Sequence, residues 1–159
     1  MEYIIVGLWL ALVICIMCFL YKYLKRRKGF ILQFQNYGKV DVPYVTLNIQ
    51  GIPLNMVVDT GCGISIITED TLKSLEFEES PRKISLSALT SDSVKSGVVR
   101  IPIEINGRVI PEDFSVYPGI DFGNFDTLYG IHINGLLGNE FLENTGCFID
   151  YEKHAIILH

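Results

Sequence analysis

The chain after residue 41 consists of short apolar runs, many with period-two alternation, separated by turn-prone residues. This pattern predicts an all-β domain. Residues 42–49 alternate, and the Gln-Gly-Ile-Pro sequence at 50–53 predicts a turn into a second strand that ends at residue 58. Further strands are expected at 64–67, 84–89, 94–99, 100–105, 114–117, 147–150 and 155–158. The Asn-Gly pair at 106–107 predicts a two-residue hairpin turn.

One or two short helices are expected beside these strands. Residues 68–75 have Thr68 as an N-cap and acids in the first turn, which favours a helix. Residues 139–144 begin a second helical segment. Pro81 predicts a loop over 77–83, and the Gly- and Asp-rich stretch 118–129 is expected to be irregular.

A weak internal repeat is visible. Residues 47–53 lead into a strand, an acidic turn and a helix, whereas residues 103–109 lead into a strand, a Gly-Leu-Leu-Gly run and a helix. Two similar halves in one small domain predict a duplicated unit.

The N-terminus has a different composition. Residues 3–21 contain no charged side chain and would span about 28 Å as a helix, which predicts a single transmembrane anchor in the lipid bilayer. Basic residues follow at 22–28, which is the reverse of a signal peptide and places the C-terminal domain in the cytoplasm. The expected division is an anchor with its basic cluster at 1–28, a linker at 29–41 and the domain at 42–159.

Charge and side-chain chemistry exclude several functions. The net charge is −5 although the juxtamembrane cluster is basic, so the domain is acidic and nucleic acid is not an expected partner. Cys62 and Cys147 are far apart and fit no metal-ligand spacing, and the three histidines share none either. Neither a metal site nor a cofactor is therefore expected.

Asp59 is the anomalous residue of the domain. It follows the apolar run 54–58, where a buried strand should continue, and a buried carboxylate is costly unless something compensates for it. Misplaced charge of this kind indicates function. The alternative is an ordinary Asx turn at the end of a strand.

Two motifs resemble those of the retropepsin-like aspartic proteases, in the single-domain branch that includes membrane-anchored bacterial members. The first is Asp59-Thr60-Gly61 with Ser65 four residues later, and the second is Gly135-Leu136-Leu137-Gly138 before a helix. The resemblance covers residues 42–158. It implies half of an acid-protease β-barrel, with Asp59 as the catalytic acid.

The family assigns a role to each matching position. A single Asp-Thr-Gly implies a homodimer that pairs Asp59 of both subunits. Thr60 is expected to hydrogen-bond across the two-fold axis, and Gly61 to approach the peptide substrate. Ser65 would brace the loop. Leu136, Leu137 and Gly138 would pack behind Asp59.

The hairpin 84–99 would be the flap that closes over an extended peptide. Its tip consists of Leu89, Thr90, Ser91, Asp92 and Ser93. The chain also departs from the family. Cys62 stands where the family usually has Ala or Ser. A hydroxyl at this position would hydrogen-bond the catalytic carboxylate, and a thiol is a poor substitute for it. Gly63 and Asn139 replace an acid and an arginine of the viral members.

Three functions are compatible with these observations. The favoured one is a membrane-anchored aspartic endopeptidase that acts on a peptide or protein substrate. The second is a retropepsin-like module that binds peptides or dimerises without turnover. The third is a small membrane-associated β-domain with no peptide function.

Overall fold

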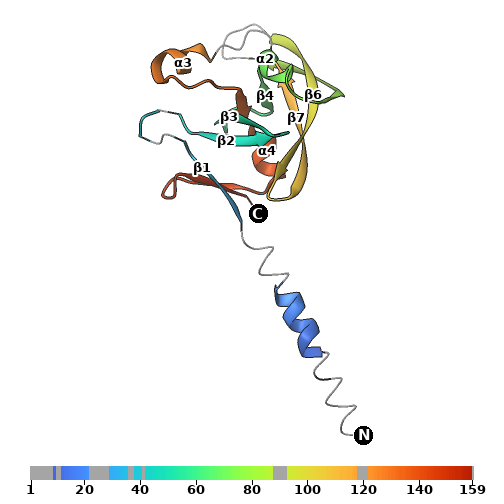
Figure 1. Cartoon of the computed structure of the whole chain (residues 1–159). Coiled ribbons are helices and arrows are strands. Elements are labelled where there is room, and N and C mark those ends of the chain that lie inside the picture. Colours follow the sequence, from blue (N-terminus) through green and yellow to red (C-terminus); the bar gives the residue numbers. More distant parts are fainter. Residues whose placement is uncertain are drawn as a thin grey trace.

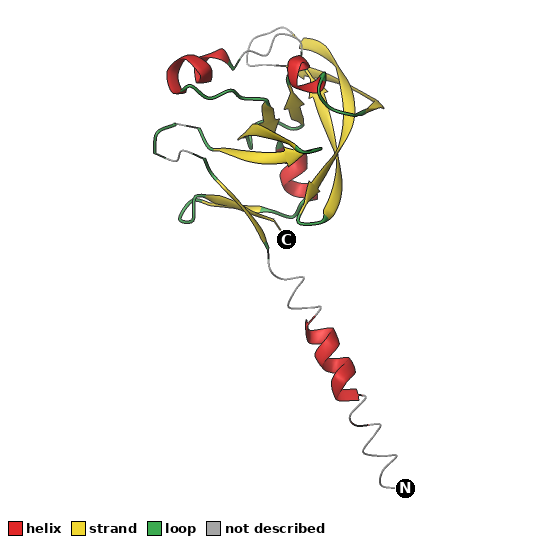
Figure 2. Ribbon diagram, in the orientation of Figure 1, coloured by secondary structure: helices red, strands yellow, loops and turns green. Residues whose placement is uncertain are grey.

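The computed structural model describes residues 9, 12–21, 29–35, 38–40, 42–87, 93–117 and 122–158. The strands of this part of the chain form two β-sheets with short helices at their margins (Figures 1 and 2). The larger sheet has seven strands in the order β2-β3-β8-β4-β7-β6-β5, and the smaller has three in the order β1-β10-β9. The expectation of a mostly β fold with few short helices is confirmed.

The strands of the larger sheet are β2 (Tyr44–Ile49), β3 (Ile52–Val58), β4 (Ser65–Ile67), β5 (Glu78–Ser87), β6 (Ser93–Ile105), β7 (Arg108–Val116) and β8 (Gly135–Leu137). Those of the smaller sheet are β1 (Phe30–Gln33), β9 (Phe148–Asp150) and β10 (Ala155–Leu158). The helices that connect them are α2 (Glu69–Leu72), α3 (Gly123–Tyr129) and α4 (Asn139–Asn144).

The larger sheet has the internal symmetry that the sequence repeat predicts. Hairpins β2–β3 and β6–β7 both turn through a pair with positive φ, Gln50-Gly51 and Asn106-Gly107. β8 pairs with β3 in parallel, β4 pairs with β7 in parallel, and β4 and β8 pair antiparallel between them. Each half therefore contributes one short strand to the other half.

The three central strands are buried on both faces. Met56, Val58, Leu137 and Ile67 join the main apolar core, together with Phe114, Phe141 and residues of the smaller sheet. The alternate residues Val57, Leu136 and Ile66 join a second cluster with Tyr44 and Ile133. A strand covered on both sides reads as a continuous apolar run, as these three do.

The structure corrects several predicted boundaries. Residues 78–83, which were expected to form a loop, belong to the edge strand β5 (Glu78–Ser87), because a register shift between Glu79 and Lys83 accommodates Pro81 at an edge. Residues 93–105 form one strand rather than two. In the expected linker, residues 30–33 form β1, which pairs with β10.

The stretch 118–129 contains α3, so the prediction of irregular structure was wrong there. Phe122 and Phe125 pack on the second apolar cluster, and Gly130 ends the helix in the left-handed conformation with φ 65°. Burial of these aromatic rings at helical spacing outweighs the local excess of Gly and Asp.

Near the N-terminus, Trp9 and residues 12–21 are helical. The remainder of the expected anchor and the basic cluster at 22–28 lie outside the described residues. In the part of the chain that the structure describes, no helix has both the length and the apolar character required to cross a membrane.

Candidate active site

Asp59 begins the loop that joins β3 to β4, and backbone hydrogen bonds fix its position. Its N–H donates to the Leu137 carbonyl at 3.1 Å, and its own carbonyl accepts from the Cys62 N–H at 3.3 Å. The Gly61 N–H donates to Asp59 Oδ1 at 2.8 Å. Asp59 as a whole residue is half-buried. The loop thus presents one oriented carboxyl at the end of a buried strand.

Helix α4 holds the far side of this loop. Its first N–H groups have no partner within the helix and need acceptors elsewhere. The Asn139 N–H donates to the Cys62 carbonyl at 2.7 Å, and the Glu140 N–H donates to the Gly63 carbonyl at 3.0 Å. The segment after the Leu-Leu-Gly motif therefore anchors the loop that carries Asp59.

The two glycines that flank the Leu-Leu pair permit close backbone contacts. A Cβ on Gly138 would lie 2.5 Å from the Ile64 carbonyl oxygen and 2.8 Å from the Ser65 nitrogen. A Cβ on Gly135 would collide with the Ile66 carbonyl oxygen. Only glycine lets the second motif pack this closely behind the first. Leu136 and Leu137 are buried on opposite faces of β8.

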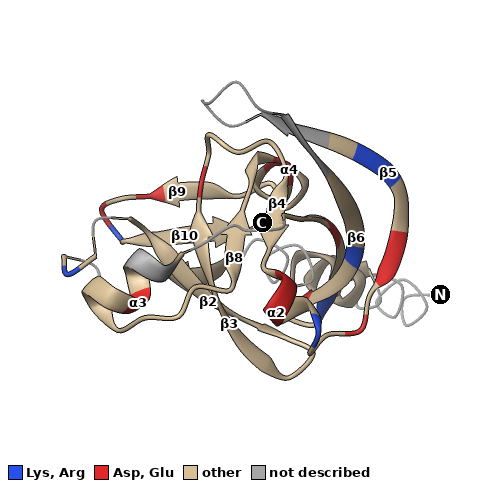
Figure 3. Cartoon of the chain, turned by 90° about the horizontal axis from the view of Figure 1, so that it is seen from above, with Lys and Arg blue, Asp and Glu red and all other residues tan. Residues whose placement is uncertain are grey.

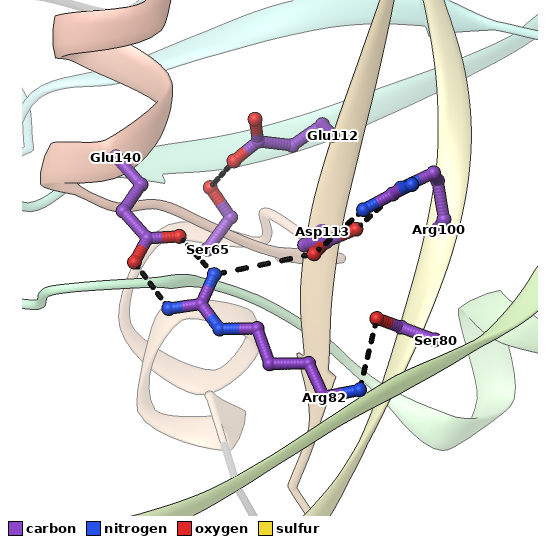
Figure 4. Close-up of polar contacts among 7 residues, drawn as sticks. All are labelled: Ser65, Ser80, Arg82, Arg100, Glu112, Asp113 and Glu140. Atoms are coloured by element: carbon purple, nitrogen blue, oxygen red, sulfur yellow. Dashed lines mark hydrogen bonds and ion pairs between the residues drawn. The ribbon is translucent and has the colours of Figure 1, made fainter.

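Ser65 joins the two motifs from inside the core. Its hydroxyl oxygen accepts from the Gly138 N–H at 3.1 Å, and its hydroxyl donates to Glu112 Oε1 at 2.7 Å. Both side chains are buried, and Glu112 is only 1% exposed. Figure 4 shows the hydrogen bond between them. Burial is the main cause that raises the Glu112 pKa to about 7.

An ion-pair group lies beside Glu112. Arg82 of β5 makes two hydrogen bonds to Glu140, at 2.7 and 2.5 Å, and its guanidinium is 4.0 Å from Asp113 (Figure 4). Arg100 of β6 makes two hydrogen bonds to Asp113, at 2.7 and 3.1 Å. Arg82 lowers the pKa of Glu140. Charged residues of both signs lie along β5 (Figure 3), and Arg82 connects this strand to α4.

The remaining predicted residues are distributed as follows. Thr60 and Gly61 are exposed on the loop. Cys62 is half-buried, its thiol donates to the Ile64 carbonyl at 3.1 Å, and burial raises its pKa.

The expected flap corresponds to hairpin β5–β6, whose last described pair is Ser87 with Ser93. Its tip residues 89–92 lie outside the described residues. Among the described side chains, no group of three or more His, Cys, Asp or Glu could hold a metal ion.

Sequence reasoning missed Glu112, although a signal was present. The side chain of Glu112 lies on the same face of β7 as those of Ile110, Phe114 and Val116. Phe114 belongs to the main core, and Ile110 and Val116 pack against it. The period-two pattern therefore places an acid on an apolar face. Its neighbours Pro111 and Asp113 mask this pattern, because together they resemble a polar turn.

Comparison with known proteins identifies the family. A family model described as aspartyl protease matches residues 45–141, a range that includes both motifs. The structure is similar to that of a retropepsin-like aspartic protease from Rickettsia conorii, with a TM-score of 0.51 and 20% identity over 82% of this chain and 89% of that chain. The retroviral protease-like domain of Ddi1 from Leishmania major has a TM-score of 0.48 and 17% identity over 75% of this chain and 87% of that chain. No curated protein sequence matches the chain. The chain belongs to the aspartyl protease family and has the retropepsin-like fold.

Proposed function

We propose that the protein is a membrane-anchored aspartic endopeptidase, active as a homodimer in which the two Asp59 carboxyls activate a water molecule. The observation that carries the proposal is the carboxyl of Asp59, oriented by the Gly61 N–H on a loop that α4 and β8 hold in place. A carboxyl fixed in this way costs no reorganisation when it reacts.

The chemistry requires a second carboxyl. Hydrolysis of a peptide bond without a metal or a nucleophilic side chain needs a base for water and an acid for the carbonyl oxygen. Two adjacent carboxyls that share one proton provide both, because like charges at close range cannot both ionise. The sequence contains one Asp-Thr-Gly, so the second carboxyl would come from a second copy of Asp59.

The exposed parts of the loop fit this arrangement. Thr60 and Gly61 are exposed, so they are accessible to a partner subunit and to substrate. Hairpin β5–β6 would close over an extended peptide and pair with it as an added strand. In this assignment the substrate is a peptide or protein segment in extended form.

Membrane attachment would favour the dimer. Residues 3–21 form the proposed anchor, and the basic residues at 22–28 would contact anionic lipid on the cytoplasmic side. Tethering raises the effective concentration of the subunits and so favours a weak dimer. Alkaline extraction of cell membranes tests this: the full chain should remain in the pellet, and its release into the supernatant would exclude a transmembrane anchor.

Cleavage of a peptide library tests the catalytic role of Asp59. The wild-type chain should cleave some members between acidic and neutral pH, and Asp59→Asn should cleave none while keeping its dimeric state. The matched control is Asp70→Asn, an exposed aspartate of α2 that is 87% exposed and should leave cleavage unchanged. Absence of cleavage by concentrated wild-type protein throughout this range would refute the proposal.

Subunit mixing tests the shared dyad. If one Asp59 from each subunit is required, a mixed dimer of wild type and Asp59→Asn is inactive. An equimolar mixture at full exchange should then retain about a quarter of the wild-type activity at the same total concentration. Retention of half would show that each subunit works alone.

One observation favours a second candidate, a module that binds peptides without turnover. Cys62 stands where the family usually has Ala or Ser, and its thiol donates to the Ile64 carbonyl. The support that a hydroxyl would give the catalytic carboxyl is therefore lacking at this position. Specific peptide binding without cleavage would establish this candidate, and Cys62→Ser would then be expected to introduce cleavage.

A further inference from the structure

Glu112 is a buried acid that peptide hydrolysis does not itself require. It is 1% exposed and lies in β7 next to Phe114 of the main core along the same face. An ionised carboxylate in such a position is costly unless hydrogen bonds or charges compensate for it. The partner of its Oε1 atom is Ser65, whose side chain is completely buried. The location of this pair, beneath the loop of Asp59, indicates a role there.

A short path of contacts connects Glu112 to Asp59. The Ser65 hydroxyl has one proton, which it donates to Glu112, so its oxygen is left to accept from the Gly138 N–H. Glu112 thus sets the orientation of the hydroxyl that holds Gly138. The residue before Gly138 is Leu137, whose carbonyl accepts from the Asp59 N–H. Loss of the acceptor at residue 112 would free the Ser65 hydroxyl and loosen this path.

Charged groups from the neighbouring elements face the same region. Glu140 of α4 and Asp113 of β7 both act to raise the Glu112 pKa, and Arg82 of β5 acts to lower it. Arg100 of β6 is paired with Asp113 and completes the group. Burial outweighs these charges, so Glu112 changes its charge near neutral pH, in contact with the residues that shape the loop.

We propose that Glu112 is a positioning residue for Asp59, which keeps the catalytic loop in its active shape through Ser65 and Gly138. The proposal rests on the proposed function for its effect on activity. Its structural part concerns only the shape of the loop, and therefore can be tested whether or not the chain cleaves peptides. Two substitutions separate the hydrogen-bond acceptor of Glu112 from its ionisable group. Glu112→Gln keeps an acceptor for Ser65 but cannot ionise, and Glu112→Leu removes the acceptor with little change in volume.

The first test follows backbone amides of the full chain by NMR. In wild type, the amide signals of Gly138 should titrate with a midpoint of about 7. This titration should vanish in Glu112→Gln and persist in Glu104→Gln, a matched control with an exposed acid on β6. A titration that survives in Glu112→Gln would overturn the proposal.

Hydrogen exchange provides the second test. In Glu112→Leu the Gly138 and Asp59 amides should exchange roughly tenfold faster, because the loss of one buried hydrogen bond is worth about that factor. The Ile156 amide of the smaller sheet reports global stability in the same sample, and Glu112→Gln should restore slow exchange. An equal acceleration at Ile156 would show that Glu112 acts on stability alone, and would overturn the proposal.

The pH dependence of peptide cleavage provides the third test. If the wild-type chain cleaves peptides, the pH profile of kcat/KM should contain an inflection near 7 that Glu112→Gln removes and Glu104→Gln retains. An unchanged profile in Glu112→Gln would overturn the positioning role. Absence of cleavage by wild type would instead refute the proposed function, and the two amide measurements would still decide the role of Glu112.

Discussion

Replacing Glu112 by Gln should remove a pH dependence from the folding stability. The carboxyl has its ordinary pKa of 4.5 in the unfolded chain and about 7 in the fold, so the folded state binds the proton more tightly. The stability that Glu112 contributes is fully present below pH 4.5 and is lost as the pH rises to about 7. The wild-type chain should thus become less stable across this window, and Glu112→Gln should not.

The size of the effect follows from the same two values. The difference between 4.5 and about 7, at about 1.36 kcal/mol for each pKa unit, corresponds to roughly 3 kcal/mol. This is a large part of the ~5–15 kcal/mol that stabilises a typical domain. With a urea dependence of about 1–3 kcal/mol per molar, the unfolding midpoint should fall by ~1 M or more.

Urea titrations monitored by far-UV circular dichroism at both ends of the window measure this effect. Protein concentration must be the same throughout, because dimerisation also stabilises the fold. Glu104→Gln is the control and should behave as wild type. Arg82 lowers the pKa of Glu140, so the stability that Glu140 contributes is lost only as the pH falls below 4.5, outside the range from pH 4.5 to 7. If Glu112→Gln loses as much stability as wild type, the reasoning about the buried acid is wrong.

Three further outcomes are expected from the contacts around the loop. Gly138→Ala should destabilise the fold by at least ~1–3 kcal/mol in thermal unfolding, because its Cβ would overlap the Ile64 backbone; an unchanged Tm would contradict the close packing. Asn134→Ala should cost roughly 1–3 kcal/mol in urea unfolding, since its Oδ1 accepts from a β3 backbone N–H at 2.9 Å; a neutral effect would mean that water replaces it. Arg82→Met should cost less than ~1 kcal/mol, and the loss should shrink in high salt because its pair with Glu140 is solvent-exposed; a larger loss, insensitive to salt, would show a desolvated pair.

Local signals in the sequence predict much of the fold. The hairpin turns were predictable because Gly51 and the Asn106-Gly107 pair are residue types that tolerate the positive φ that these turns adopt. Thr68 was predictable as an N-cap because its side chain accepts from the Thr71 N–H within the same turn. Helix α3 was missed because the spacing of its aromatic residues was outweighed by glycines and acids nearby.

The candidate site is predictable only in part. Asp59 is visible because a charge interrupts an apolar run, and Gly138 because it belongs to a motif. Ser65 and Glu112 are 47 residues apart, and only the parallel pairing of β4 with β7 brings them together. No local pattern specifies this pairing. The sequence therefore predicts the candidate catalytic residue Asp59 but not the buried carboxyl of Glu112 that accepts from Ser65.

The exchange of short strands between the two halves has a consequence for folding during synthesis. β8 lies between β3 and β4, so the centre of the sheet stays open until residues 135–137 have left the ribosome. The hairpins β2–β3 and β6–β7 are local and can form early, whereas the insertion of β8 brings together segments distant in sequence and is expected to be slow. The Asp59 loop depends on Leu137 and Asn139 for its hydrogen bonds. A nascent chain that ends before these residues therefore lacks the contacts that shape the Asp59 loop.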